Sequence, residues 1–121
     1  MLSDQTTTAI GRLGESIAAA YLELAGFRIL NRNLRRGRHE LDLVATRGDL
    51  LCLVEVRLRR RGALASAVET VSRVKQQRLA AAAARVAAAH RARACRFDVI
   101  AIDWAPEKGL SLVHIVDAFR P

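Results

Sequence analysis

The sequence predicts one α/β domain, spanning residues 1–121, in which a mixed central sheet is flanked by helices. The length suits a single hydrophobic core, and a hydrophobic content of 51% excludes a disordered chain. Two segments carry apolar residues at helical spacing, and five shorter apolar runs are separated by turn-forming residues. In chain order, these segments predict the arrangement α-β-β-β-α-β-β.

The N-terminal half begins with a helix and continues with three strands. Apolar residues recur at helical spacing across residues 8–25, and Gly26 supplies a C-terminal stop. The stripe expected to pack on the sheet consists of Ile10, Leu13, Ile17, Tyr21 and Leu24. Strands are expected at residues 27–34, 39–46 and 50–58.

The C-terminal half is predicted to hold one helix and two strands. The helix starts near Ser66, which forms a capping-box pattern with Glu69, and it continues through an alanine-rich stretch to His90. Strands at residues 95–103 and 110–116 then close the sheet around a turn at residues 105–109.

The hydrophobic pattern of the second and third strands selects one hairpin register. A two-residue turn at 48–49, with glycine first as in a type II′ turn, pairs Thr46 with Leu51. Continuation of this ladder sets Asp42 opposite Glu55. One face is then apolar and the other polar; the apolar face has Leu41, Leu43, Ala45, Cys52, Val54 and Val56, and the polar face has Glu40, Asp42, Glu55 and Arg57. A shift of one residue would mix the two faces.

Two carboxylates in direct cross-strand contact repel each other, so a positive charge must compensate. Mg²⁺ or Mn²⁺ would do so, because these ions take oxygen ligands from one or two carboxylates and leave positions for water and a phosphate. Alternatively, Arg57 and other arginines neutralise Asp42 and Glu55 on a solvated face of the sheet. Spacing alone supports both interpretations equally.

The charge balance predicts a polyanionic partner, with nucleic acid favoured over membranes. The formal net charge is +8 and the isoelectric point is near 11.1, and arginine clusters neutralise phosphates. Two arginine runs bracket the hairpin and are expected to bind a nucleic-acid backbone; they include Arg35, Arg36, Arg38, Arg59, Arg60 and Arg61. No apolar run approaches the length of a membrane span and the N-terminus does not resemble a secretory signal, so we expect a cytoplasmic protein that binds no membrane.

Five short motifs resemble a known family. They are Gly14-Glu15, Glu40-Leu41-Asp42-Leu43, Glu55-Val56-Arg57, the helix around Lys75, and Arg96-Phe97-Asp98-Val99. Their order and spacing resemble the YraN-like family of uncharacterised bacterial proteins. That family is grouped with the PD-(D/E)XK nucleases and is distantly similar to archaeal Holliday junction resolvases. The resemblance implies a restriction-endonuclease-like fold and, because those resolvases act as dimers, a homodimer.

The resemblance also implies roles for individual residues. Asp42 would be the metal-binding aspartate, Glu55 the second acidic ligand, and Glu15 an accessory acid on the first helix, although helical angle sets Glu15 opposite the apolar stripe. The family pattern has lysine two residues after Glu55, whereas this chain has Arg57. Arginine stays protonated and cannot act as a base, but it can stabilise negative charge on a phosphate.

Two further positions have competing interpretations. Lys75 interrupts the apolar stripe of the second helix. Its stem could pack among apolar neighbours while the ammonium reaches solvent, or the ammonium could supply the cation near Asp42 and Glu55. Asp98 is expected to be a structural hydrogen-bond acceptor rather than a ligand, because apolar residues flank it in a strand.

The sequence therefore predicts a Mg²⁺- or Mn²⁺-dependent endonuclease that hydrolyses phosphodiester bonds in DNA, branched or junction DNA included. Its catalytic site would comprise Glu15, Asp42, Glu55, Arg57 and Lys75. The alternative is a non-catalytic nucleic-acid-binding module that retains the nuclease scaffold, and a third hypothesis is a protein-interaction role.

Overall fold

The computed structural model describes residues 4–36, 39–60 and 71–120, which form two helices and one five-stranded sheet. The elements are α1 (Asp4–Leu24), β1 (Arg28–Arg36), β2 (His39–Arg47), β3 (Leu50–Arg60), α2 (Arg73–His90), β4 (Ala94–Ala105) and β5 (Gly109–Ile115). The expected order α-β-β-β-α-β-β is confirmed. Neighbouring strands follow chain order, and only β3 and β4 pair in parallel among the described strands, so the sheet is mixed.

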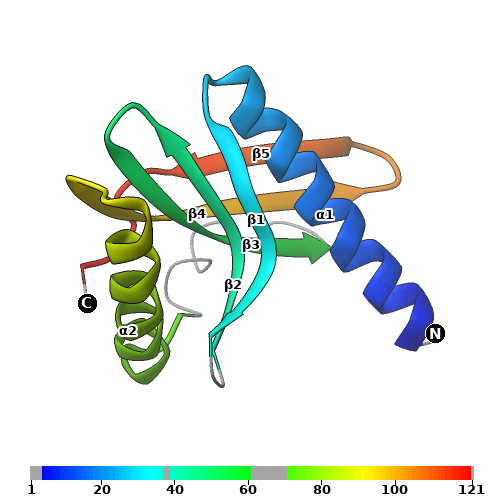
Figure 1. Ribbon diagram of the computed structural model, residues 1–121. Helices are drawn as coiled ribbons and strands as arrows, with labels where there is room; N and C mark the ends of the chain where they lie inside the picture. Colours follow the sequence, from blue (N-terminus) through cyan, green and yellow to red (C-terminus); the bar gives the residue numbers. More distant parts are fainter. Residues whose placement is uncertain (1–3, 37–38, 61–70, 121) are drawn as a thin grey trace.

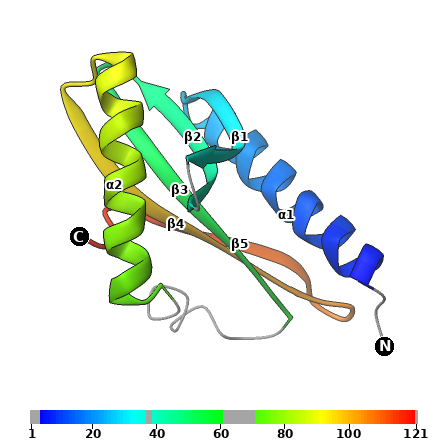
Figure 2. The same ribbon diagram turned by 60° about the horizontal axis from the view of Figure 1, so that its bottom comes forward.

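The two helices cover opposite faces of the sheet (Figures 1 and 2). Because side chains alternate along a strand, neighbouring residues of β3 enter different cores. Leu51 and Leu53 pack in the cluster that contains the buried face of α2. Cys52 and Val54 pack in the cluster that contains the buried face of α1. Both faces are therefore apolar at the centre of the sheet, and a polar face is restricted to its margin.

The helix α1 packs on the sheet through small residues together with part of the predicted stripe, since Ile17 and Tyr21 lie against the buried cluster. Leu13 and Leu24 are 59% and 91% exposed, so the prediction is wrong at these two positions. Gly14 lies so close to β3 that a Cβ atom there would sit 3.6 Å from Cβ of Leu58. The residues of α1 that are fully buried are Ala18, Ala19 and Leu22. Small side chains let α1 approach the sheet closely, and Leu13 and Leu24 lie on its exposed side.

The helix α2 starts later than predicted, at Arg73. Ser72 is extended, with φ −61° and ψ 159°, and its side-chain oxygen accepts a hydrogen bond from the Lys75 amide at 3.1 Å. Ser72 is therefore the N-cap. The predicted capping pair, Ser66 and Glu69, lies outside the described residues. The buried stripe of α2 is Leu79, Ala82, Ala83 and Val86.

The β2–β3 hairpin has the predicted turn and register, but its ladder is shorter than predicted. Gly48 adopts φ +59°, as the first central residue of a type II′ turn requires. Pairing runs from the turn to Leu43 and Val54, one step short of the predicted pair Asp42 and Glu55. Beyond that point β2 stays with β1, whereas β3 stays with β4 to its end (Figure 1). We call this divergence of β2 from β3 the fork.

Candidate active site

Asp42 lies at the fork and is tied to β3 by a backbone hydrogen bond. Instead of continuing the ladder, the Val56 amide donates to Oδ2 of Asp42 at 2.9 Å. The carboxylate thereby takes the place of a backbone carbonyl where the two strands separate. Glu55 is the preceding residue on β3, and only 4% of its surface is exposed. The fork thus brings two acidic side chains from adjacent strands to the margin of the core.

Two cations from different elements contact Glu55. Nζ of Lys75, on α2, donates to Oε2 of Glu55 at 3.0 Å. Nη2 of Arg57, on β3, lies 3.5 Å from the same oxygen. Of the two arrangements considered for Lys75, the structure shows the one in which the ammonium lies against the acidic pair.

The electrostatic environment shows that these cations do not fully compensate the acids. Burial raises the pKa of Glu55, the charge of Asp42 raises it further, and Lys75 and Arg57 oppose the shift. Burial also raises the pKa of Asp42, against the Val56 hydrogen bond and the two cations. Because both pKa values stay above their ordinary range, the site still favours additional positive charge.

Glu15 belongs to the same environment, although its helical angle suggested an exposed position. It is partly buried beside the small-residue face of α1, and its carboxylate hydrogen-bonds the side chain of Asn33. Burial raises the pKa of Glu15, and the charges of Asp42 and Glu40 add to this increase. Asn33 was not predicted to take part. Its backbone has a φ of +51°, which asparagine tolerates better than most residues.

The donor set suits an ion that needs few protein ligands. Within the described residues, no group of three or more histidine, cysteine or acidic side chains is arranged to hold a metal ion. Mg²⁺, however, is commonly bound through one or two carboxylates and retains several waters. Hydrogen bonds from described groups occupy Oδ2 of Asp42 and Oε2 of Glu55. Among the described residues, no hydrogen bond to the second oxygen of either carboxylate competes with a cation.

The predicted nucleic-acid-binding arginines are described only in part. Arg38 and Arg61 lie outside the described residues. Arg35 and Arg36 pair through their backbones with Glu40 and His39 at the start of β2, and Arg59 and Arg60 pair with Asp103 and Trp104 at the end of β3; their side chains are outside the described set. The described backbone of both runs therefore lies beyond the fork, at the end of the hairpin away from its turn.

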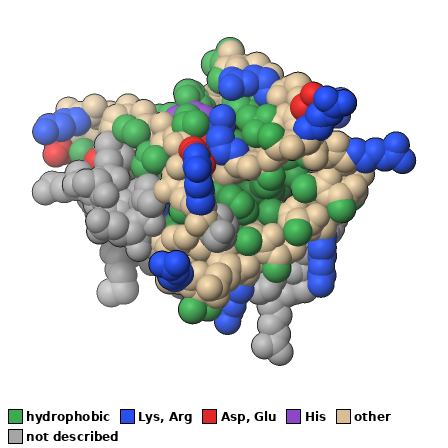
Figure 3. All heavy atoms as spheres, turned by 90° about the vertical axis from the view of Figure 1, so that its left-hand side faces the viewer, with side chains coloured by type: hydrophobic (Ala, Val, Ile, Leu, Met, Phe, Trp, Pro, Cys, Tyr) green, Lys and Arg blue, Asp and Glu red, His purple; other side chains and the backbone are tan. Residues whose placement is uncertain are grey.

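Basic side chains predominate on the face shown in Figure 3. Lys and Arg (blue) are more frequent there than Asp and Glu (red), and they surround a central apolar area instead of forming one block.

The helices in the described part of the chain include none that is long and apolar enough to span a membrane.

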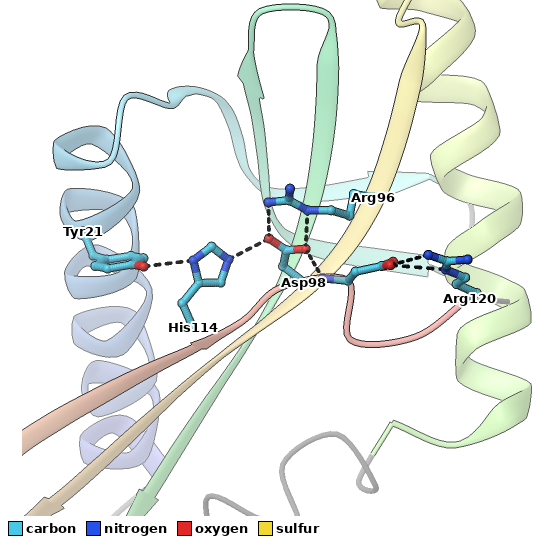
Figure 4. Close-up of polar contacts among 6 residues, drawn as sticks. Tyr21, Arg96, Asp98, His114 and Arg120 are labelled. Atoms are coloured by element: carbon cyan, nitrogen blue, oxygen red, sulfur yellow. Dashed lines mark hydrogen bonds and ion pairs between the residues drawn. The ribbon is translucent and has the colours of Figure 1, made fainter.

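Asp98 is the structural acceptor that the sequence predicted (Figure 4). It is fully buried and accepts two hydrogen bonds of 2.8 Å from Arg96, one of 2.6 Å with Nε2 of His114, and one of 2.9 Å from the Asp117 amide. Burial alone would raise the pKa of Asp98, but these donors lower it. Nδ1 of His114 lies 2.9 Å from the hydroxyl of Tyr21, so the network joins α1, β4 and β5.

Comparison with known proteins places the chain in a family. Residues 14–102 match the family model described as "Uncharacterised protein family UPF0102". The chain belongs to the UPF0102 family. The matched segment contains all five predicted catalytic residues, so the YraN-like resemblance is confirmed at the level of the family.

Several bacterial relatives carry the description "UPF0102 protein". One from Anaeromyxobacter dehalogenans is 49% identical over 98 residues, which cover 79% of this chain and 73% of the relative. Another from Chlorobium chlorochromatii is 38% identical over 120 residues, or 94% of this chain and 93% of the relative. A third from Myxococcus xanthus is 41% identical over 111 residues, or 90% and 87%.

Proposed function

We propose that this UPF0102 protein is a Mg²⁺- or Mn²⁺-dependent endonuclease of the PD-(D/E)XK type, with a restriction-endonuclease-like core, that hydrolyses phosphodiester bonds in DNA. The observation that carries the proposal is the fork. There Asp42 and Glu55 meet at the margin of the core, next to Lys75 from α2 and Arg57 from β3. Acidic ligands for a divalent ion, beside cations for a phosphate, form the donor set that metal-assisted phosphodiester hydrolysis needs.

Each residue would have a separate part in this reaction. A divalent ion bound to Asp42 and Glu55 would polarise the phosphate and lower the pKa of a coordinated water. The Val56 amide orients Asp42 by fixing Oδ2. Lys75 and Arg57 approach Glu55 from different elements and can turn toward the negative charge that develops on a phosphate. Arg57 cannot act as a base, so a proton must leave the attacking water through another group.

A non-catalytic DNA-binding module is the second candidate, and one observation favours it. Lys75 and Arg57 both contact Glu55. If these ion pairs satisfy the fork, the same scaffold binds phosphates through its arginines and does not turn over. The homodimer implied by the family resemblance is also a proposal, which light scattering in solution tests.

The decisive experiment is a cleavage assay on branched, duplex and single-stranded DNA with Mg²⁺, Mn²⁺ or EDTA. Asp42→Asn should abolish cleavage in every metal, because it removes an anionic ligand while preserving side-chain shape. Asp49→Asn is the matched control, since Asp49 has a side chain 76% exposed in the hairpin turn. Calorimetry with Mn²⁺ should show binding to the wild type and to Asp49→Asn but not to Asp42→Asn.

The two candidates give different results in this assay. Salt-sensitive DNA binding without cleavage in either metal identifies the binding module. Cleavage that persists in Asp42→Asn, or that is lost equally in Asp49→Asn, removes the fork from the catalytic site.

A further inference from the structure

The first turns of α2 face β2 across a polar pocket of about 330 Å³. Its polar lining consists of Glu40 and Asp42 on the strand side and Ser72, Lys75 and Arg78 on the helix side. One wall is therefore acidic and is continuous with the fork, and the opposite wall carries two basic residues one helical turn apart.

The two basic residues of this wall are in different states. Lys75 is paired with Glu55 at 3.0 Å. Arg78 is exposed, and no described residue forms an ion pair or a hydrogen bond with its guanidinium. An arginine presents five donors and binds phosphate oxygens in pairs. As far as the described residues go, Arg78 is thus open to an anionic ligand in the wall opposite Asp42.

We propose, on the basis of the endonuclease function above, that this pocket is a subsite for the phosphate next to the scissile one, and that Arg78 binds it. A helix rises 1.5 Å per residue, so Lys75 and Arg78 are separated by about 4.5 Å along α2. Lys75 and Arg78 are thus one helical turn apart and line the same pocket as Asp42, so we assign them to adjacent phosphates of one DNA strand.

The same helix provides a matched control. Arg85 lies two turns further along α2, is also exposed, and is absent from the lining of this pocket. If Arg78 were only a solvated surface residue, Arg78→Gln and Arg85→Gln would change DNA binding equally. If Arg78 contacts a phosphate in the subsite, only its substitution removes one counterion-releasing contact.

The first arm of the test measures anisotropy of a labelled DNA duplex in EDTA across a salt series. Each phosphate contact contributes about 0.9 to the slope of log K against log salt, so Arg78→Gln should lower the slope by about 0.9. The same value predicts an affinity loss of about eightfold at ~0.1 M salt relative to ~1 M. Arg85→Gln should leave slope and affinity unchanged, and Arg78→Lys should restore the slope. Equal effects of the two glutamine variants, or wild-type binding without salt dependence, overturn the subsite.

The second arm uses a cleavable strand with one uncharged methylphosphonate beside the cleaved bond. The neutral linkage should reduce kcat/KM of the wild type by about the same factor as Arg78→Gln does on the unmodified strand. On the modified strand, Arg78→Gln should cause no further reduction of kcat/KM. If the reduction from the linkage and the reduction from the substitution multiply, Arg78 does not bind that phosphate. Arg78-dependent binding without any cleavage refutes the endonuclease and leaves Arg78 as a phosphate contact of a binding module, whereas cleavage with Arg78 and Arg85 equivalent refutes the subsite alone.

Discussion

Replacing Lys75 by methionine should destabilise the fold by about 1.5–3 kcal/mol at neutral pH, because Glu55 loses its nearest cation. At 3.0 Å the gross attraction is about 5.5 kcal/mol for an effective dielectric constant of 20. Solvent screens much of this attraction, since the Lys75 side chain is 39% exposed. Arg57 remains 3.5 Å from the carboxylate and limits the loss. The expected net value is that of one charged hydrogen bond.

The loss of stability in Lys75→Met should increase as the pH rises. Burial raises the pKa of Glu55 and Lys75 lowers it, so the substitution moves this pKa further upward. A carboxyl group whose folded pKa exceeds its unfolded value stabilises the fold below the unfolded pKa and loses that contribution as pH rises through the folded pKa. The deficit of Lys75→Met should therefore be small near about pH 4 and grow toward neutral pH.

Urea denaturation of four proteins at about pH 4 and about pH 7.5 measures this effect: the wild type, Lys75→Met, Glu55→Gln and the double variant. Lys108→Met is a direct control, because Lys108 is exposed in the β4–β5 turn and is the only other lysine. The double variant should recover most of the loss at neutral pH. A deficit that is equal at the two pH values, or strictly additive effects of the two substitutions, would refute the ion pair as the cause.

Three other substitutions test the fold. Asp98→Asn should lower the free energy of unfolding by about 3 kcal/mol at neutral pH, as measured by urea denaturation. Because the folded pKa of Asp98 is lowered, its contribution is present above the unfolded pKa and is lost as pH falls through the folded pKa. An equal loss of stability in acid would contradict this assignment. Ser72→Ala should lower the free energy of unfolding by about 1 kcal/mol through loss of the N-cap, and no change would place the start of α2 elsewhere. Gly48→Ala should destabilise the fold by about 1 kcal/mol because Gly48 has a positive φ, and Gly11→Ala, in a helix, should stabilise it slightly. Neither new Cβ meets an atom within 4 Å, so the difference reports backbone conformation alone. Thermal melts that rank the two variants the other way would exclude backbone conformation as the cause.

Features set by local pattern could be predicted from the sequence. The order of elements follows from apolar periodicity and turn residues, and the hairpin register follows from the alternation around Gly48. The fork could not be predicted, because it arises where β2 and β3 follow different partners. The start of α2 was missed for a related reason: the capping-box pattern at Ser66 was chosen from sequence spacing, whereas the N-cap is set by the extended backbone of Ser72.

In the candidate site, too, features set by local pattern could be predicted and features set by tertiary packing could not. Asp42 and Glu55 could be chosen because register alone brings them near each other, and Lys75 stood out because it interrupts an apolar stripe. Glu15 could be chosen only through the family resemblance, because helical angle alone set it on the exposed side and did not reveal a helix that packs through alanine and glycine. Arg78 gave no signal, because exposed arginines are frequent in this chain and only tertiary structure sets this one opposite Asp42.

The parallel pairing of β3 with β4 has a consequence for the order of events during folding. The β2–β3 hairpin closes over a two-residue turn, so Asp42 and Glu55 can meet within about 1–10 μs. Lys75 reaches Glu55, 20 positions earlier in the chain, only after α2 has formed and crossed over the sheet toward β4, which is a slower, less local step. The folding chain therefore brings the two acids together before their cation arrives. Substitution of Lys75 should accordingly accelerate unfolding and leave the folding rate nearly unchanged, whereas substitution in the hairpin turn should slow folding.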